Sequence, residues 1–304
     1  MITVKKIIVS LEFLLTELLY IISFCFNFIK AFFSCFLRLS SFSALPYRKV
    51  VNSNSKVAVL ANGPSLKKVL EHYQEYDEFH DTEYMVMNYF CHHPLFKVLK
   101  PKYYGMADPM FIKPDDKYDK VVKAFETLNT EVDWDMVLVC PFRRQEFLKY
   151  SGLTNPHIKI HCINTPLYHG GSMARHLLYK LGLSHPIFGT VAVLCIFYLL
   201  NRGYQNVNVF GVDMTFLEGI TINDNNELCT KIKHFYDDKV ELKPYIDPSN
   251  MKVMKLSKYI DNFGYMLKGH EDMEEYSQRV NSHIINCTEE SMLDCYVRRP
   301  KIDL

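Results

Sequence analysis

Seven short apolar runs, separated by segments with helical spacing, constrain the fold of this 304-residue chain more than any other feature. Each run is bounded by turn residues, as the central strands of a parallel sheet are. The runs are Val57–Ala61, Tyr84–Asn88, Tyr103–Ala107, Met136–Cys140, Ile158–Cys162, Val207–Gly211 and His283–Asn286. The helix candidates are Ser65–Tyr73, Lys117–Leu128, Arg143–Tyr150, Ser172–Lys180, Thr190–Arg202 and Glu271–Asn281. This alternation predicts an α/β fold with a doubly wound, mostly parallel Rossmann-like sheet and helices on both faces.

The first predicted strand ends in the tetrapeptide Asn62-Gly63-Pro64-Ser65, which is typical of a tight turn that opens a helix. Gly63 permits a backbone conformation that a side chain would obstruct, and Pro64 suits the first turn of a helix. The free N–H groups at a helix start can bind an anion. The turn therefore predicts a phosphate site, and an ordinary strand-to-helix connection is the alternative.

A second candidate site follows the apolar stretch Gly189–Tyr204, which predicts a buried helix that stops at Gly203. The strand after it ends in Gly211-Val212-Asp213, at the edge where open α/β sheets bind ligands. A structural alternative is that Asp213 caps the next turn. The polar region Leu217–Pro248 breaks the periodicity and predicts a long loop or a partly ordered lid.

The N-terminal segment is apolar from Ile7 to Phe42, with one narrow polar stripe at helical spacing. The stripe consists of Glu12, Thr16, Ser23, Asn27, Lys30, Ser34 and Arg38. It fits a helix lying in a membrane interface, a tilted spanning helix, or a buried helix of a soluble core. We expect a membrane-associated helical segment over residues 1–45 and one α/β domain over residues 50–304, with residues 217–248 as its loop or lid. The flanking basic residues favour an anionic cytoplasmic membrane surface.

The composition narrows the function classes. The net charge of +1 argues against a general nucleic-acid binder. None of the nine cysteines has CxxC spacing, which indicates a reduced compartment without a disulfide framework or a zinc site.

Several motifs in register resemble the bacterial sialyltransferase-like superfamily over about residues 56–297. They are Ala61-Asn62-Gly63-Pro64-Ser65-Leu66, Arg202-Gly203-Tyr204, Phe210-Gly211-Val212-Asp213, His234-Phe235-Tyr236-Asp237 and Ile284-Ile285-Asn286-Cys287-Thr288 with Ser291-Met292-Leu293-Asp294. That superfamily includes lipooligosaccharide sialyltransferases that use CMP-sialic acid, flagellin-modifying motility-associated factors and a hydroxymethylpterin pyrophosphokinase branch.

The resemblance implies a nucleotide site and a catalytic base. The implied nucleotide-binding residues are Ala61, Asn62, Gly63, Ser65, Asn88, Asp108, Thr190, Gly211, Asp213 and Thr215. His270 matches the general base, and a histidine can take the proton of an acceptor hydroxyl near neutral pH. Thr215 and His234 stand near the places where sialyltransferases have two tyrosines at the leaving phosphate. The resemblance therefore implies that either His270 or His234 deprotonates the acceptor hydroxyl and that the other assists departure of the phosphate. Asp108 replaces an asparagine, and the donor-binding arginine is not recognisable near Phe188 and Gly189.

The sequence therefore predicts a membrane-associated, inverting glycosyltransferase of bacterial surface polysaccharide or lipooligosaccharide biosynthesis, at the cytoplasmic face of the inner membrane. The expected partners are a nucleotide-sugar donor, CMP-linked and sialic-acid-like, a glycan or glycolipid acceptor and the membrane surface. The scheme needs no metal or cofactor, and it is compatible with a homo-oligomer. One alternative is a pterin-type pyrophosphokinase with Mg²⁺ held by Asp108, Asp213 and Asp237. The other is a non-catalytic, membrane-tethered nucleotide-binding or scaffold protein.

Overall fold

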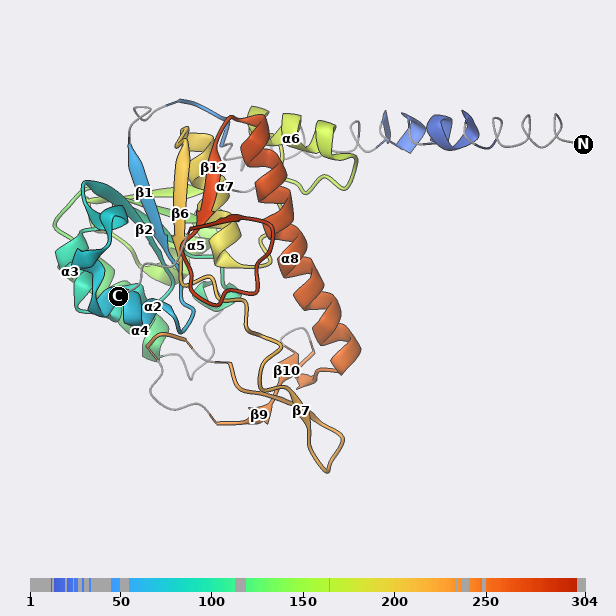
Figure 1. The fold of residues 1–304 in the computed structure, drawn as a ribbon. Helices are drawn as coiled ribbons and strands as arrows, with labels where there is room; N and C mark the ends of the chain where they lie inside the picture. The colour runs from blue at the N-terminus through green and yellow to red at the C-terminus, as the bar shows by residue number, and fades with distance from the viewer. Residues whose placement is uncertain are drawn as a thin grey trace, which may run out of the picture.

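Eight parallel strands form the central sheet in a computed structural model of the chain (Figure 1). The strands are β1 (Lys56–Leu60), β2 (Thr82–Met87), β3 (Tyr103–Gly105), β4 (Met136–Cys140), β5 (Ile158–Cys162), β6 (Asn206–Phe210), β12 (His283–Asn286) and β13 (Val297–Arg298). The structure describes residues 12, 14–19, 21–23, 25–26, 29, 33, 45–49, 55–112, 119–163, 165–232, 234–236, 241–247 and 250–299. All seven predicted strands are confirmed, and each end lies within two residues of its predicted position.

The order of the strands is β13-β12-β6-β1-β2-β3-β4-β5. The chain therefore builds the sheet outward from β1 through β5, and then returns to place β6 on the free side of β1. This reversal makes the gap between the carboxyl ends of β1 and β6 the topological switch point. Open α/β sheets bind their ligands at such a point.

Helices cover both faces of the sheet, as the doubly wound prediction requires. They are α2 (Leu66–Glu71), α3 (Leu95–Leu99), α4 (Asp119–Glu131), α5 (Arg144–Ser151), α6 (Ser172–Leu181), α7 (Val191–Arg202) and α8 (Leu256–Arg279). Four short 3₁₀ helices lie between them: η1 (Tyr73–Glu75), η2 (Asp77–Phe79), η3 (Phe90–His92) and η4 (Pro109–Phe111). Alternate residues of β1 point to opposite faces. Val57 and Val59 pack into a core with α7, whereas Ala58 and Leu60 pack into a second core on the other face.

The helix predicted over Glu271–Asn281 is much longer in the structure, since α8 begins at Leu256. Its buried side includes Tyr259, Phe263, His270 and Met273, at the three- and four-residue steps of one helical face. Glycines at 264 and 269 weaken the local helix signal. Packing of this buried face overrides the weak propensity, and His270 consequently lies inside the helix and not at its start.

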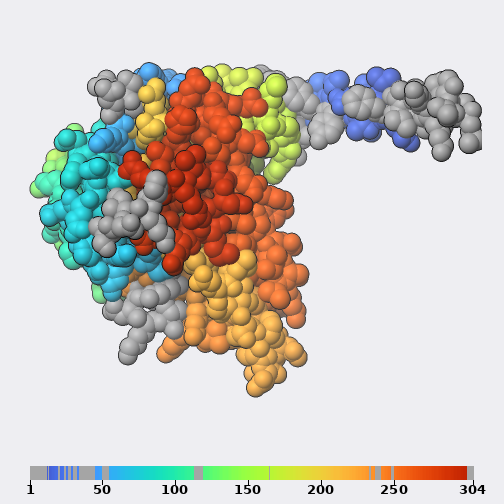
Figure 2. Space-filling model, viewed as in Figure 1, coloured from blue at the N-terminus to red at the C-terminus, as the bar shows by residue number. Residues whose placement is uncertain are grey.

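The region predicted as a loop or lid forms one small antiparallel sheet and contributes one strand to a second. One consists of β7 (Thr221–Ile222), β8 (Leu228–Thr230) and β9 (Lys243–Pro244), and the other of β10 (Ile246–Asp247) and β11 (Lys252–Val253). Leu228, Met254 and Tyr259 form a separate apolar core beneath them. Figure 2 shows this region, coloured light orange, as a lobe at one end of the molecule. It is thus ordered by its own core and by the first turns of α8.

The N-terminal segment is described only at some positions between Glu12 and Phe33, and these are helical. Their large apolar side chains are exposed, from Leu18 at 52% to Phe26 at 68%, so the described ones do not join the core. No helix among the described residues has the length and apolar content needed to cross a bilayer.

The segment Leu45–Lys49 packs against the α/β domain. Leu45 is 3% exposed, and its carbonyl oxygen accepts a hydrogen bond from the Asn201 amide at 2.6 Å. The N–H of Tyr47 donates to the carbonyl of Lys180, and the N–H of Arg48 donates to that of Asn201. These bonds attach the segment to the ends of α6 and α7.

We therefore expect Leu45→Ala to lower the free energy of unfolding by about 2–5 kcal/mol, because it leaves a cavity between α6 and α7. Leu14→Ala, at an exposed position, should change the same free energy by no more than about 0.5 kcal/mol. Urea unfolding of the full chain measures both. Equal stability of the two variants would mean that Leu45 is not part of the core.

Candidate functional site

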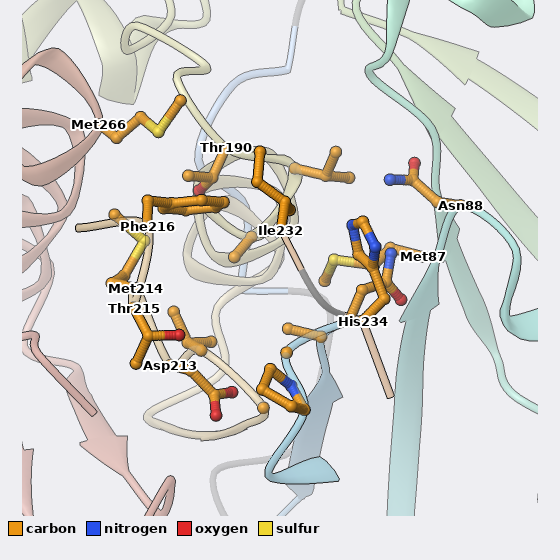
Figure 3. Close-up of a pocket in the computed structure, with 18 of the residues that line it drawn as sticks. Met87, Asn88, Thr190, Asp213, Met214, Thr215, Phe216, Ile232, His234 and Met266 are labelled. Atoms are coloured by element: carbon orange, nitrogen blue, oxygen red, sulfur yellow. The ribbon is translucent and has the colours of Figure 1, made fainter. Parts of the chain in front are cut away.

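A cavity of about 720 Å³ opens at the switch point between β1 and β6 (Figure 3). Its walls come from the segments that follow β1, β2, β3 and β6, from the start of α7, and from the lobe. In Figure 3, Asp213, Met214, Thr215 and Phe216 lie on one wall, and Met87, Asn88 and His234 lie on the other. A cavity of this size is typical of small-molecule and cofactor sites.

The structure brings most of the predicted site residues to this cavity. Those that line it are Ala61, Asn62, Gly63, Asn88, Asp108, Thr190, Gly211, Asp213, Thr215 and His234. Ser65 and His270 do not line it. Ser65 contacts Asp213 and His270 contacts Thr190, and these two partners do line the cavity. The contacts limit the role that Ser65 and His270 can have at the site.

The start of α2 already has an anion. The carboxylate of Asp213 accepts a hydrogen bond from the N–H of Ser65 at 3.0 Å and from its hydroxyl at 2.9 Å. The N–H of Gly63 donates to the carbonyl of Gly211 at 2.8 Å. Both donors of Ser65 and the N–H of Gly63 are therefore engaged within the protein, which leaves them no free donor for the phosphate expected at this turn.

Burial raises the pKa of the Asp213 carboxyl, and the two hydrogen bonds from Ser65 oppose that rise. The carboxylate joins the end of β6 to the start of α2. The structural alternative predicts that Asp213 caps the turn that follows it. Asp213 does cap a turn, but this turn is at Ser65, 148 residues earlier in the chain.

Gly63 is required by the close approach of these two segments. A Cβ atom at this position would lie 1.8 Å from a carboxylate oxygen of Asp213 and 2.5 Å from the carbonyl oxygen of Gly211. Gly211 has a φ of +68°, a conformation that glycine adopts without strain. Both glycines therefore have packing roles beneath the cavity.

Two asparagines that line the cavity, Asn62 and Asn88, have buried side-chain oxygens without a hydrogen-bond partner among the described residues. Asn88 has a φ of +49°, which places its side chain at the end of β2 in a conformation that asparagine tolerates better than most residues. A buried acceptor without a partner is costly, so these two atoms indicate a ligand that donates hydrogen bonds.

The charged residues of the cavity come mainly from loops. Asp108 follows β3, and its carboxylate accepts a hydrogen bond from the N–H of Met110 at 3.1 Å. Glu218, Lys231 and His234 come from the lobe. The ring of His234 is half-buried and stacks on that of Tyr236, with centroids 5.1 Å apart. His234 is thus the imidazole that lines the cavity among the described residues.

His270 lies behind the cavity wall, with none of its surface exposed. Its Nε2 is 3.1 Å from the hydroxyl oxygen of Thr190, and its Nδ1 is 2.8 Å from that of Tyr296. Burial lowers the pKa of the imidazole to about 3. Both ring nitrogens are engaged and the ring is away from the cavity surface, so His270 does not reach an acceptor hydroxyl.

Sequence reasoning missed most of the apolar part of the wall, including Phe216 and Met266, and it missed Tyr296. These residues carry no local motif, and only the packing of distant segments brings them to the site.

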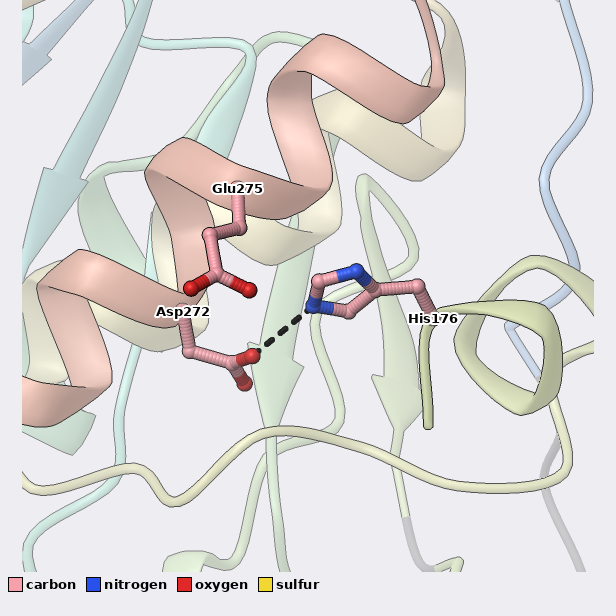
Figure 4. Close-up of side chains that lie close together, drawn as sticks. All are labelled: His176, Asp272 and Glu275. Carbon is pink, nitrogen blue, oxygen red and sulfur yellow. Dashed lines mark hydrogen bonds and ion pairs between the residues drawn. The ribbon is translucent and has the colours of Figure 1, made fainter. Parts of the chain in front are cut away.

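A second cluster joins α6 to α8 (Figure 4). The carboxylate of Asp272 accepts hydrogen bonds from Arg175, His176 and Tyr179, each at 2.9 Å. The other ring nitrogen of His176 accepts from the Nε of Arg279 at 3.0 Å. Glu275 lies close enough for a three-ligand metal group. Because both nitrogens of His176 already have partners, the cluster is a structural network between the two helices.

We expect Gly63→Ala to destabilise the fold by about 1–3 kcal/mol, because its Cβ would displace the Asp213 carboxylate. Gly264→Ala is the matched control: an added Cβ there meets no atom within 4 Å, and alanine favours the interior of α8. Thermal unfolding should show a loss for the first variant and no loss for the second. A Gly63→Ala protein as stable as the wild type would contradict the close contact.

Comparison with known proteins adds one structural likeness. No family model matches the chain, and no curated protein matches it. Among solved structures, the chain is similar to the MAf glycosyltransferase from Magnetospirillum magneticum AMB-1, with a TM-score of 0.42 and 12% identity. The alignment covers 85% of this chain and 35% of that one, so the chain spans about a third of the length of that enzyme.

Proposed function

We propose that this protein is a glycosyltransferase that binds a nucleotide-sugar donor in the cavity between β1 and β6. The observation that carries the proposal is the pair of buried, unpaired amide oxygens of Asn62 and Asn88 at the switch point of the sheet. Ribose hydroxyls and the amino group of cytosine are hydrogen-bond donors that could satisfy them. A CMP-linked donor is our first candidate, as the resemblance of the motifs implies.

The proposed reaction is a single displacement that inverts the anomeric carbon. The acceptor hydroxyl gives its proton to His234 while its oxygen forms a bond to the anomeric carbon. The bond from that carbon to the phosphate oxygen breaks, and its electron pair leaves with the nucleotide. His234 fits the role of base because its ring lines the cavity, whereas His270 is buried behind it.

The N-terminal segment supports a membrane-proximal acceptor, such as a glycolipid, because its described apolar side chains are exposed. An amphipathic helix with this character can lie in a bilayer interface. We propose this placement for the enzyme, on the cytoplasmic side of a bacterial membrane.

The pyrophosphokinase alternative is less well supported. It needs several carboxylates free to bind Mg²⁺. Both oxygens of Asp213 accept hydrogen bonds from Ser65, and Asp108 accepts one from Met110. Asp237, the third candidate, lies outside the described residues.

Binding is tested with a thermal-shift panel of CMP, UDP, GDP and ATP, followed by calorimetry. We expect CMP to raise the melting temperature by mass action. Asn88→Gly should weaken CMP binding by roughly 5- to 150-fold, because it removes one hydrogen bond worth about 1–3 kcal/mol. Glycine accepts the positive φ at this position, so the backbone is retained.

The matched control is Asn226→Gly, which makes the same change at a φ of +57° in the exposed turn between β7 and β8. It should bind CMP as the wild type does. Binding of another nucleotide in place of CMP would reject the cytidine donor, and no binding of any nucleotide would reject the proposed function.

Catalysis is tested with His234→Gln. Loss of a general base should lower the turnover number by ~10²–10⁴-fold and leave CMP affinity within a few-fold of wild type. His169→Gln, at an exposed position away from the cavity, is the control and should keep full turnover. Transfer to a glycolipid acceptor with a CMP-sugar donor gives the rates. Turnover of His234→Gln within a few-fold of wild type would exclude His234 as the base.

A further inference from the structure

A buried chain of hydrogen bonds leads from the core to the cavity wall. Tyr296, 3% exposed, contacts the Nδ1 of His270, and the Nε2 of His270 contacts the hydroxyl of Thr190. Tyr296 lies between β12 and β13, His270 in α8, and Thr190 just before α7. Thr190 is the member of this chain that lines the cavity (Figure 3).

The positions of the protons in this chain follow from the requirement that each buried donor has a hydrogen-bond acceptor. The hydroxyl of Tyr296 is buried, and its hydrogen-bond partner among the described residues is the Nδ1 of His270. Leaving a buried donor unpaired costs about 1–3 kcal/mol. Tyr296 therefore donates to Nδ1. A neutral imidazole carries one proton, so that proton lies on Nε2.

The Nε2–H then donates to the oxygen of Thr190. The same oxygen accepts the N–H of Val193 at 3.3 Å, as the cap of α7. A hydroxyl oxygen accepts two hydrogen bonds and donates one. With both acceptor positions used inside the protein, the hydroxyl proton of Thr190 is left as a donor at the cavity wall.

We propose that Tyr296 and His270 are positioning residues, which fix the hydroxyl of Thr190 as a hydrogen-bond donor to a phosphate oxygen of the bound nucleotide. The identity of the ligand rests on the proposed function. The positive end of the dipole of the 12-residue helix α7 lies at Thr190 and also favours a negatively charged acceptor. The fall in the pKa of His270 to about 3 keeps the ring neutral, which preserves the single tautomer at physiological pH.

The tautomer is tested first, on the protein without ligand. Nitrogen-15 NMR of the imidazoles distinguishes a protonated ring nitrogen from an unprotonated one, and the spectrum of His270→Gln identifies the signals of His270. We expect the proton on Nε2 and no titration between pH 5 and pH 9. A proton on Nδ1, or a charged ring within this range, would overturn the proposal whether or not the protein binds nucleotides.

The ligand contact is tested by measuring the affinity for CMP and for cytidine, which lacks the phosphate. Thr190→Val should weaken CMP binding by roughly 10- to 100-fold, through loss of a hydrogen bond to a charged group. It should leave cytidine binding unchanged, and Thr190→Ser should keep the affinity for CMP. Equal losses for CMP and cytidine would overturn the phosphate contact.

The role of His270 is tested with two substitutions of similar size, one that keeps an N–H donor and one that removes it. His270→Gln retains an N–H that can reach Thr190, whereas His270→Leu fills the space without a donor. We expect the glutamine variant to keep more CMP affinity than the leucine variant at equal cytidine affinity. If both variants bind CMP as the wild type does, His270 does not position Thr190. If the wild type binds no nucleotide, the proposed function fails, and the tautomer alone decides whether the hydroxyl of Thr190 is fixed.

Discussion

The contact between Asp213 and Ser65 holds the site together. It crosses the switch point of the sheet and joins the segment after β6 to the start of α2, 148 residues earlier in the chain. Gly63 lies directly beneath this contact, with no room for a side chain. The cavity is built over this junction, so the positions of Asn62 on one side and Thr215 on the other depend on it.

Because Asp213 pairs with Ser65, the start of α2 is less suited to a phosphate than the start of α7. The start of α2 is occupied by the protein's own carboxylate, which provides the negative charge that a helix N-terminus favours. The start of α7 has no acidic residue in its first turn, and Thr190 caps it from the cavity side. Two helices begin near the same cavity. The start of α2 is paired with the carboxylate of Asp213, whereas the start of α7 has no acidic residue in its first turn that would oppose a bound anion.

Much of the fold was predictable from the sequence, because its sheet is built from short apolar runs that lie between turn residues. β13 was missed because Val297 and Arg298 form only a two-residue strand, which has no periodicity to detect. The first half of α8 was missed because its glycines resemble breaks in a helix, although its buried face is continuous.

The site was predictable to the extent that strand ends share one edge of a sheet, which brings Asn62, Asn88 and Asp213 together. The pairing of Asp213 with Ser65 and of His270 with Tyr296 was not, because these partners are far apart in sequence and meet only through packing. The burial of His270 follows from the position of α8, so its role could not be judged from the motif around it.

The attachment of Leu45–Lys49 has a geometric consequence. Its partners, Lys180 and Asn201, lie near the C-terminal ends of α6 and α7, whereas the cavity adjoins the opposite end of α7, at Thr190. Figure 1 shows the N-terminal segment and the lobe at opposite ends of the molecule. The 12 residues of α7 span about 18 Å along the helix axis, so the attachment of Leu45–Lys49 lies about one helix length from the cavity. Under the proposed membrane placement, the cavity would lie on the side of the domain away from this attachment, and an extended glycan would reach it more readily than a sugar next to the lipid.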